Sequence, residues 1–301
     1  MGGVRAFLKH FPRPAAASPG ATRALLQPFV NNVGWPQPLV PDGVSVQAGT
    51  VRGVKGEWLL PRGQKLSAGV ERLLVWAHGG GFVYCSPASH RRFLGLVAAS
   101  ADVPVFCVDY RKPPGFPYPA PAEDVANAFQ GLREQGLAQR LFLGGDSAGG
   151  NLAIAATKAL VRPEAELAPP EGVLLLSPWV DLSDISGDSW QSEEDYIPAD
   201  LAQVAARYYA GGLPLEDGRL SPARSHDWAR FPPVLLEYAE AERFRSQIER
   251  LQAAMGRGGV DVRAWAEEGQ VHGYPLWDFV WGGGPGPFEA FFGRVAAFLR
   301  R

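Results

Sequence analysis

The segment GDSAG at residues 145–149 most constrains what this chain can fold into, because it joins an apolar run at 141–143 to a helix-like run at 151–159. A short apolar run before a glycine-rich turn is typical of a buried strand. A serine flanked by glycines between a strand and a helix is typical of a sharp turn that holds the hydroxyl out of the backbone. An ordinary strand-to-helix turn can carry the same pattern, so the interpretation depends on a second motif.

The second motif is HGGGF at residues 78–82, which follows an apolar run at 73–77 that is typical of a buried strand. Consecutive glycines present bare amides, and such amides can donate to a carbonyl oxygen that becomes negatively charged during acyl transfer. Together with the amide after the serine they predict an oxyanion hole, which we assign to Gly80, Gly81 and Ala148. A phosphate-binding loop is the alternative, but neither GxGxxG nor GxxxxGK[ST] can be read across 78–84 or 144–150.

Four segments together resemble one family of enzymes. They are HGGGF at 78–82, Asp109-Tyr110-Arg111, GDSAGGNLA at 145–153 and SPWVDLS at 177–183. In this order they are similar to the hormone-sensitive-lipase branch of the α/β-hydrolase carboxylesterases, and the resemblance runs from about residue 70 to the end of the chain. It implies a capped α/β-hydrolase that cleaves carboxylic esters, with short to medium acyl chains preferred in most members.

Strand and helix patterns alternate along the chain. Strands are predicted at residues 56–60, 71–77, 103–109, 140–144, 172–177, 233–239 and 260–266. Helices are predicted at about 87–101, 121–135, 148–162, 244–255 and 287–300. This alternation favours a mostly parallel sheet with helices on both faces, in which active residues lie at the carboxyl ends of the strands.

Two stretches interrupt the alternation, residues 1–45 and residues 184–225, the second with a predicted helix around 201–209. Both lie where the resembled family builds its helical cap, so we expect one α/β-hydrolase domain over 1–301 with a cap from these two stretches. Pocket residues that would contact substrate are predicted from aromatic side chains near the site and in the cap: Phe82, Phe29, Trp35, Tyr208 and Tyr209. Packing between cap and core is the alternative for these aromatic residues.

The predicted general base is His272. Of the histidines at 10, 78, 90, 226 and 272, it alone follows the last predicted strand and precedes the terminal helix. In this fold the base comes last, after the serine and the acid. His78 belongs to the oxyanion motif and is expected to orient that loop, and the other three are expected at surface or packing positions. No HExxH motif or close His/Asp set is present, so we expect no metal and no cofactor.

The acid departs from the resembled family, whose members usually carry Asp-Pro-Leu after a strand that begins with two prolines. Aligned on Pro232-Pro233, the corresponding place holds Glu242-Arg243-Phe244. A glutamate can accept the imidazole N–H as an aspartate does, so Glu242 is the predicted acid. Glu240 stays open as the alternative acid, and so does a chain that works without either carboxylate.

The remaining carboxylates of the matching segments and both cysteines are predicted to be structural. Asp146 lies beside the serine, but His272 already supplies a base, so Asp146 is expected to fix neighbouring loops, and Asp124 and Asp181 are interpreted in the same way. Cys107 lies in an apolar run typical of a buried strand, and we expect structural free thiols at Cys85 and Cys107 rather than a disulfide.

Charge and hydropathy exclude several partners. The 29 basic residues are scattered among 31 acidic ones, with a net charge of −2, whereas nucleic acid would favour a basic face. The apolar stretches are far shorter than the roughly 18 residues that span a bilayer, and no signal-peptide core is evident near Met1. We expect no transmembrane segment, a cytoplasmic location and a small-molecule ester as the only partner besides further copies in a homo-oligomer.

The predicted function is therefore hydrolysis of short to medium acyl esters by Ser147, His272 and Glu242, with an acyl-enzyme intermediate. An amidase or arylformamidase of the same fold is one alternative. A ligand-binding receptor built on a hydrolase-like fold is another, but such receptors lack the catalytic histidine that this chain has at His272.

Overall fold

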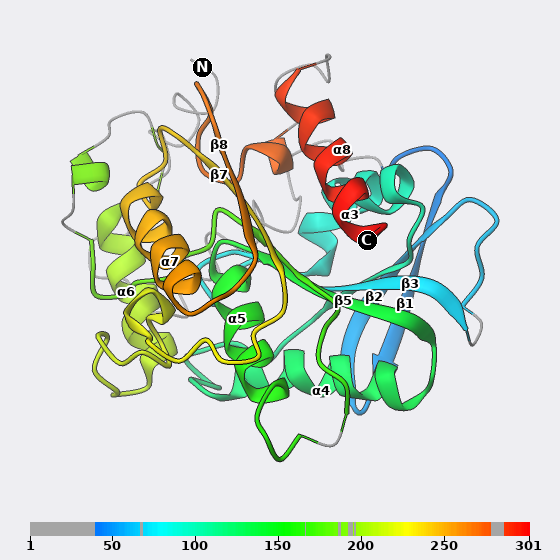
Figure 1. Cartoon of the computed structure of the whole chain (residues 1–301), viewed down its shortest axis with the longest axis horizontal. Coiled ribbons are helices and arrows are strands. Elements are labelled where there is room, and N and C mark those ends of the chain that lie inside the picture. The colour runs from blue at the N-terminus through cyan, green and yellow to red at the C-terminus, as the bar shows by residue number, and fades with distance from the viewer. Residues whose placement is uncertain are drawn as a thin grey trace.

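The fold is built on one eight-stranded sheet (Figure 1). The structure is a computed structural model that describes residues 40–66, 69–165, 167–185, 188–191, 195, 197–277 and 286–301. Its strands are β1 (Val44–Val51), β2 (Val54–Pro61), β3 (Val70–Ala77), β4 (Val105–Val108), β5 (Ala138–Asp146), β6 (Val173–Leu176), β7 (Val234–Ala239) and β8 (Val262–Glu267). The α-helices are α3 (Pro87–Ala101), α4 (Ala120–Glu134), α5 (Ala148–Leu160), α6 (Ala199–Ala210), α7 (Arg245–Arg257) and α8 (Pro287–Leu299). Short 3-10 helices are η1 (Asp188–Gln191), η2 (Pro222–Arg224) and η3 (Tyr274–Trp277).

The strand order is β1-β2-β4-β3-β5-β6-β7-β8, and all pairs from β4 to β8 are parallel. β2 alone runs against its two neighbours. The predicted mostly parallel sheet is therefore confirmed, and each predicted strand and helix has a counterpart. The sequence interpretation missed β1: its first two residues lie in the stretch 1–45 that was assigned to the cap, and its other residues were assigned to no element.

Side chains of the sheet alternate between two hydrophobic cores, as the period of a strand requires. In β3, Leu73, Val75 and Ala77 face one core, whereas Leu74 and Trp76 face the other. The first core receives α4, α5, α6 and α7, and the second receives α3 and α8. Figure 1 shows α3 and α8 on one side of the sheet and α4 and α5 on the other, which confirms the predicted helices on both faces.

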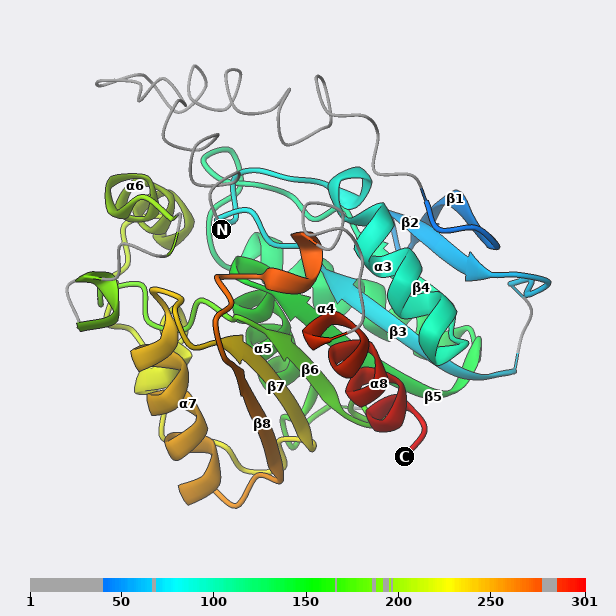
Figure 2. The same cartoon turned by 90° about the horizontal axis from the view of Figure 1, so that it is seen from above.

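The region predicted to form the second part of the cap holds η1, α6 and η2. Figure 2 shows α6 standing clear of the strands, on the side of the sheet to which their carboxyl ends point. α6 contacts the HGGGF loop, since a Cβ added at Gly81 would lie 3.5 Å from Cβ of Ala205. The other predicted part of the cap, at residues 1–45, lies outside the described residues up to residue 39.

Candidate active site

The GDSAG turn joins β5 directly to α5, and Ser147 is the residue between them. Ser147 has φ 54° and ψ −124°, a conformation that costs a non-glycine residue energy and is common at functional turns. Its N–H donates to the carbonyl of Leu176 at 2.9 Å, and its own carbonyl accepts from the Trp179 N–H at 2.9 Å. The strained conformation is thus held from both sides by the segment that follows β6.

Both glycines of the turn are required by close backbone approach. A Cβ at Gly145 would lie 2.3 Å from the carbonyl oxygen of Gly149, and a Cβ at Gly149 would lie 2.0 Å from that of Ala77. These separations are far shorter than any real contact. The local sequence therefore lets α5 start directly against the end of β3, where the second glycine motif begins.

The HGGGF loop follows β3 and folds back on itself. Gly80 has φ 107° and Gly81 has φ 58°, values that favour glycine over residues with a Cβ. The Gly80 carbonyl accepts from the N–H groups of Val83 at 3.2 Å and Tyr84 at 2.8 Å. Within the described ranges, no acceptor lies on the amides of Gly80, Gly81 or Ala148. These amides have the free donor capacity that an oxyanion hole needs.

Asp146 ties the glycine loop to the serine turn. Its Oδ1 accepts from the Trp76 indole N–H at 2.9 Å and from the Gly79 N–H at 3.1 Å. Its Oδ2 lies 3.1 Å from Nε2 of His90, whose Nδ1 contacts the Ser89 hydroxyl at 2.9 Å. Asp146 therefore fixes neighbouring loops, as the sequence predicted, and His90 is a buried packing residue.

His78 contacts the HGGGF loop at Gly79 and packs on Tyr110. Its Nδ1 lies 2.8 Å from the carbonyl oxygen of Gly79, and its ring stacks on Tyr110 with centroids 4.3 Å apart. The Tyr110 hydroxyl donates to the His78 carbonyl at 2.8 Å. Burial, together with Lys112 and His90, holds the pKa of His78 well below its usual range, so the ring is neutral and serves to orient the loop.

Glu242 and His272 lie on the loops that follow β7 and β8. Both are buried, with 1% of Glu242 and 5% of His272 exposed. Oε2 of Glu242 lies 3.9 Å from Nδ1 of His272, an ion-pair distance rather than a hydrogen bond. The same Oε2 accepts from the Ser177 hydroxyl at 2.6 Å and from the Ala239 N–H at 3.1 Å. The two side chains are therefore close enough for an ion pair when the imidazole is protonated.

Glu240 has different surroundings. It is exposed, its N–H donates to the Glu267 carbonyl at 3.0 Å, and its own carbonyl accepts from Arg245 at 3.4 Å. Asp261 is also exposed, immediately before β8, and pairs with Arg301 at 3.7 Å. Of the three carboxylates, only Glu242 is buried beside the His272 ring.

The pKa of His272 responds to two opposing effects. Burial lowers it, because desolvation disfavours the imidazolium. Contact with Glu242, and the charges of Asp195 and Asp146 at longer range, outweigh burial and raise the pKa above its usual 6.5. The ring of Phe244 packs edge-on against the imidazole with centroids 4.9 Å apart, so an apolar side chain helps to bury the His272 ring.

The predicted pocket residues divide into three groups. Phe82 and Tyr209 are fully buried and stack face to face, with centroids 3.9 Å apart and an interplanar angle of 1°. Tyr208 is half-buried at the adjacent position of α6. Phe29 and Trp35 lie outside the described residues. The described pair thus packs α6 against the oxyanion loop, the arrangement given above as the alternative to substrate contact.

Sequence reasoning gave no role to Ser177, although SPWVDLS was one of the matching segments. Its hydroxyl donates to Glu242 and accepts from the Gly273 N–H at 3.1 Å. Ser177 is 65 residues from Glu242 and 96 residues from Gly273 in the sequence, so no local sequence pattern predicts these contacts.

Asp124 and Asp181 are structural, as predicted. Asp124 pairs with Arg111 at 2.8 Å, and Asp181 pairs with Arg224 at 3.0 Å.

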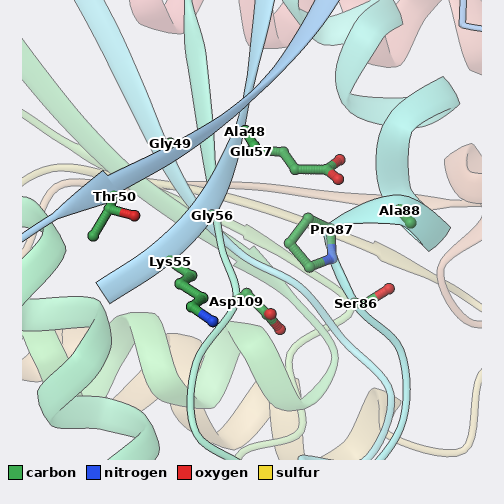
Figure 3. A pocket seen from close by; sticks show the side chains of 10 residues that line it. All are labelled: Ala48, Gly49, Thr50, Lys55, Gly56, Glu57, Ser86, Pro87, Ala88 and Asp109. Carbon is green, nitrogen blue, oxygen red and sulfur yellow. The ribbon is translucent and has the colours of Figure 1, made fainter. Parts of the chain in front are cut away.

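An open hollow of about 610 Å³ lies between β1, β2, the start of α3 and Asp109, and not at the predicted active site (Figure 3). Its two acidic side chains already have cationic partners: Glu57 accepts from Arg91 at 2.7 Å and Asp109 from Lys112 at 2.8 Å. None of the predicted site residues lines it.

The other predictions concern metals, thiols and membrane spans. Among the described residues, no group of three His, Cys, Asp or Glu side chains could hold a metal ion. Cys85 and Cys107 carry free thiols, as predicted. In the same part of the chain no helix combines the length and the apolar character that a bilayer span requires.

The α/β-hydrolase class is defined by three features of this fold: a strained serine between a strand and a helix of a parallel sheet, a glycine-rich loop close to that turn, and a buried Glu–His pair on the loops after β7 and β8. A family described as alpha/beta hydrolase fold matches residues 74–276. An acetyl-hydrolase of Streptomyces hygroscopicus is 35% identical over 224 residues, which cover 72% of this chain and 72% of that protein. The carboxylesterase/phospholipase LipF of Mycobacterium tuberculosis is 30% identical over 227 residues, which cover 71% of this chain and 59% of LipF.

Among solved structures, an esterase from the bacterial hormone-sensitive lipase family is similar over 99% of this chain and 95% of its own, with a TM-score of 0.85 and 26% identity. The chain belongs to the α/β-hydrolase family and, within it, to the hormone-sensitive-lipase-like carboxylesterases. It is an ester hydrolase, and the fold and family predicted from the sequence are confirmed.

Proposed function

We propose that this esterase cleaves carboxylic esters of short to medium acyl chain through a Ser147–His272–Glu242 triad and an acyl-enzyme. The observation that carries the proposal is the strained Ser147, with φ 54°, on a turn held by the segment after β6. That same segment bonds to Glu242, whose carboxylate lies 3.9 Å from the His272 ring.

In the proposed mechanism His272 removes the proton from the Ser147 hydroxyl as the oxygen attacks the ester carbonyl. Glu242 holds the imidazole in the correct tautomer and stabilises the imidazolium that forms. His272 then gives its proton to the departing alcohol, which leaves the acyl group on Ser147. Water, activated by the same imidazole, releases the acid and restores the serine.

The proposed oxyanion hole consists of the Gly80, Gly81 and Ala148 amides. Hydrogen bonds from such amides strengthen as charge develops on the carbonyl oxygen, so they lower the barrier more than they tighten substrate binding. The buried Asp146, which accepts from the Gly79 N–H at 3.1 Å, supports the proposal because it fixes the glycine loop against the serine turn.

The packing of α6 supports the preference for short to medium acyl chains. Cβ of Ala205 lies 3.5 Å from the position that a Cβ at Gly81 would take, and the Phe82–Tyr209 stack fills the space beside it. The described part of the proposed cap therefore lies close to the oxyanion loop and limits the space beside it. Tyr208, Phe29 and Trp35 are proposed to line the remaining substrate pocket with these residues.

The wider proposals concern the whole chain. Residues 1–301 form one hydrolase domain, with a cap from about 1–45 and 184–225. The net charge of −2 supports an enzyme that needs no nucleic-acid partner. A cytoplasmic location is supported by the free thiols of Cys85 and Cys107, and the chain is compatible with a homo-oligomer.

A panel of p-nitrophenyl esters of graded acyl length, assayed with the wild type and with Ser147→Ala, tests this function. We expect kcat/KM to be highest at short to medium chain lengths. Ser147→Ala should lower turnover by several orders of magnitude, with residual catalysis of about 10³–10⁴ over water from binding and the oxyanion hole. A Ser147→Ala variant with wild-type turnover, or a preference for long acyl chains, would overturn the respective part of the proposal.

A further inference from the structure

The last residue of β6 and the segment that follows it touch all three proposed triad loops, and Ser177 makes the central contact. Leu176 and Trp179 hold the backbone of Ser147 through two hydrogen bonds of 2.9 Å. Between them, the Ser177 side chain reaches the loops of Glu242 and His272. One short segment thereby connects the nucleophile, the acid and the base.

The Ser177 hydroxyl uses both its donor and its acceptor capacity. Its O–H donates to Oε2 of Glu242 at 2.6 Å, a length typical of a strong bond to an ionised carboxylate. Its oxygen accepts from the N–H of Gly273 at 3.1 Å, and Gly273 directly follows His272. Ser177 is fully buried, so water cannot replace either contact without a cavity opening.

The backbone of Ser177 has a strained conformation, which fixes the position of its hydroxyl. Ser177 has φ 45°, a left-handed conformation that costs a residue with a Cβ energy and persists only when its surroundings hold it. The Ser177 N–H donates to the Glu237 carbonyl at 2.7 Å, which fixes the turn from β7. A side chain held in this way has a fixed direction.

A glutamate needs such fixing more than a shorter acid does. Its side chain has an additional torsion, and ordering a free glutamate costs up to about 2 kcal/mol of conformational entropy. Oε1 of Glu242 is buried with no hydrogen-bond partner among the residues that the structure describes, whereas Oε2 accepts from both Ser177 and Ala239. The carboxylate is therefore anchored by one oxygen, the oxygen that lies 3.9 Å from Nδ1 of His272.

We propose that Ser177 is a positioning residue: its hydroxyl anchors the Glu242 carboxylate and the backbone beside His272 in one arrangement, so that the acid can orient the base. This inference rests on the proposed triad. It predicts that Ser177 contributes to turnover chiefly through Glu242, because its short bond of 2.6 Å goes to the acid, whereas the base loop makes a longer contact of 3.1 Å.

The test is a double-mutant cycle of Ser177→Ala and Glu242→Gln, with kcat and KM measured on one ester at one pH. In the wild-type background we expect Ser177→Ala to lower kcat by about 10- to 100-fold, the loss typical of a bond to a charged group, with KM changed less than about threefold. In the Glu242→Gln background the same substitution should cost less than about threefold, since residues that act as a unit are not additive.

Ser177→Gly separates the hydroxyl from the backbone conformation. Glycine adopts φ 45° without cost, so a variant that loses activity as Ser177→Ala does assigns the loss to the hydroxyl. Ser177→Cys keeps a weak donor and should recover part of kcat. Circular dichroism and Tm confirm folding, and if Ser177→Ala does not fold, Ser177→Gly takes its place in the cycle.

The outcomes separate this inference from the proposed triad. Equal costs of the Ser177 substitution in both backgrounds, or a cost below about threefold in the wild-type background, would overturn the positioning role and leave the triad standing. A Glu242→Gln variant with wild-type kcat would overturn the assignment of the acid, and the role of Ser177 with it.

Discussion

Two glutamates, Glu240 and Glu242, lie two residues apart in the loop after β7 and have opposite surroundings. Glu240 is exposed, whereas Glu242 is 1% exposed and lies beside the His272 ring. A carboxylate in water gives only screened, weak support to a distant imidazole. A buried carboxylate next to the ring orients it directly, so the difference in burial between the two glutamates supports Glu242 as the acid.

Glu242→Gln and Glu240→Gln, measured on one ester at one pH, are expected to differ widely. The Glu242→Gln amide can donate to the imidazole and favour the wrong tautomer, a change that costs a serine protease about 10⁴-fold in kcat. Glu240→Gln should cost less than about tenfold, because its charge is screened by water. A more severe defect in Glu240→Gln would move the acid two residues upstream, and two active variants would mean that the esterase works without either carboxylate.

The pH dependence of kcat/KM is predicted from the raised pKa of His272. The base must be neutral to accept the serine proton, so activity should be lost as the pH falls through the pKa of this residue. Glu242, Asp195 and Asp146 together outweigh burial, so the apparent pKa should lie above the usual 6.5. A pH–rate profile of the wild type and of Glu242→Gln measures it, and the apparent pKa should be lower in the variant. An unchanged value in Glu242→Gln would contradict the pairing.

For single residues, the sequence was sufficient to predict roles only for those that belong to short motifs. Ser147, Gly80, Gly81 and Ala148 were predicted because the tight turns around them require glycines at fixed positions in the sequence. A role for Ser177 was not predicted, because it depends on contacts with residues that lie 65 and 96 positions away in the sequence. Which partner a buried hydroxyl meets is decided by the packing of the strands, not by its neighbours in sequence.

Among the elements, the helix and strand pattern was predicted where periodicity was clear. The run at 201–209 was expected to be a helix and is α6, Ala199–Ala210. β1 was missed because Val44, Val46 and Val51 are separated by small and polar residues, and only its first two residues lie in the stretch assigned to the cap. Its pairing with β2 is a tertiary contact that the strand pattern alone does not specify.

Gly149, the second glycine of the GDSAG turn between β5 and α5, should not tolerate replacement by a residue with a side chain. Gly149→Ala would place a Cβ 2.0 Å from the Ala77 carbonyl oxygen, so backbone must move, at a cost of about 3 kcal/mol or more. The matched control is Gly293→Ala in α8, where an added Cβ meets nothing within 4 Å and should stabilise by about 0.5–1 kcal/mol. Chemical denaturation measures both, and a Gly149→Ala variant as stable as the wild type would contradict the close approach.

For the whole molecule, alternating strands and helices were sufficient to predict a mostly parallel sheet, because parallel strands need crossover helices on their faces. The same rule placed Ser147, Glu242 and His272 on loops at the carboxyl ends of β5, β7 and β8. The packing of α6 on the oxyanion loop could not be predicted in this way, since it depends on how aromatic side chains such as Phe82 and Tyr209 meet.

The central claim is that Ser147 is the nucleophile of this esterase, and covalent labelling tests it most directly. The protein is treated with a serine-directed phosphonate, its residual ester hydrolysis is followed, and the modified peptide is located by mass spectrometry. We predict one adduct per chain, on Ser147, formed in step with the loss of activity, and no adduct in Ser147→Ala. An adduct on another residue that accompanies inactivation, or full labelling of Ser147→Ala, would contradict the account.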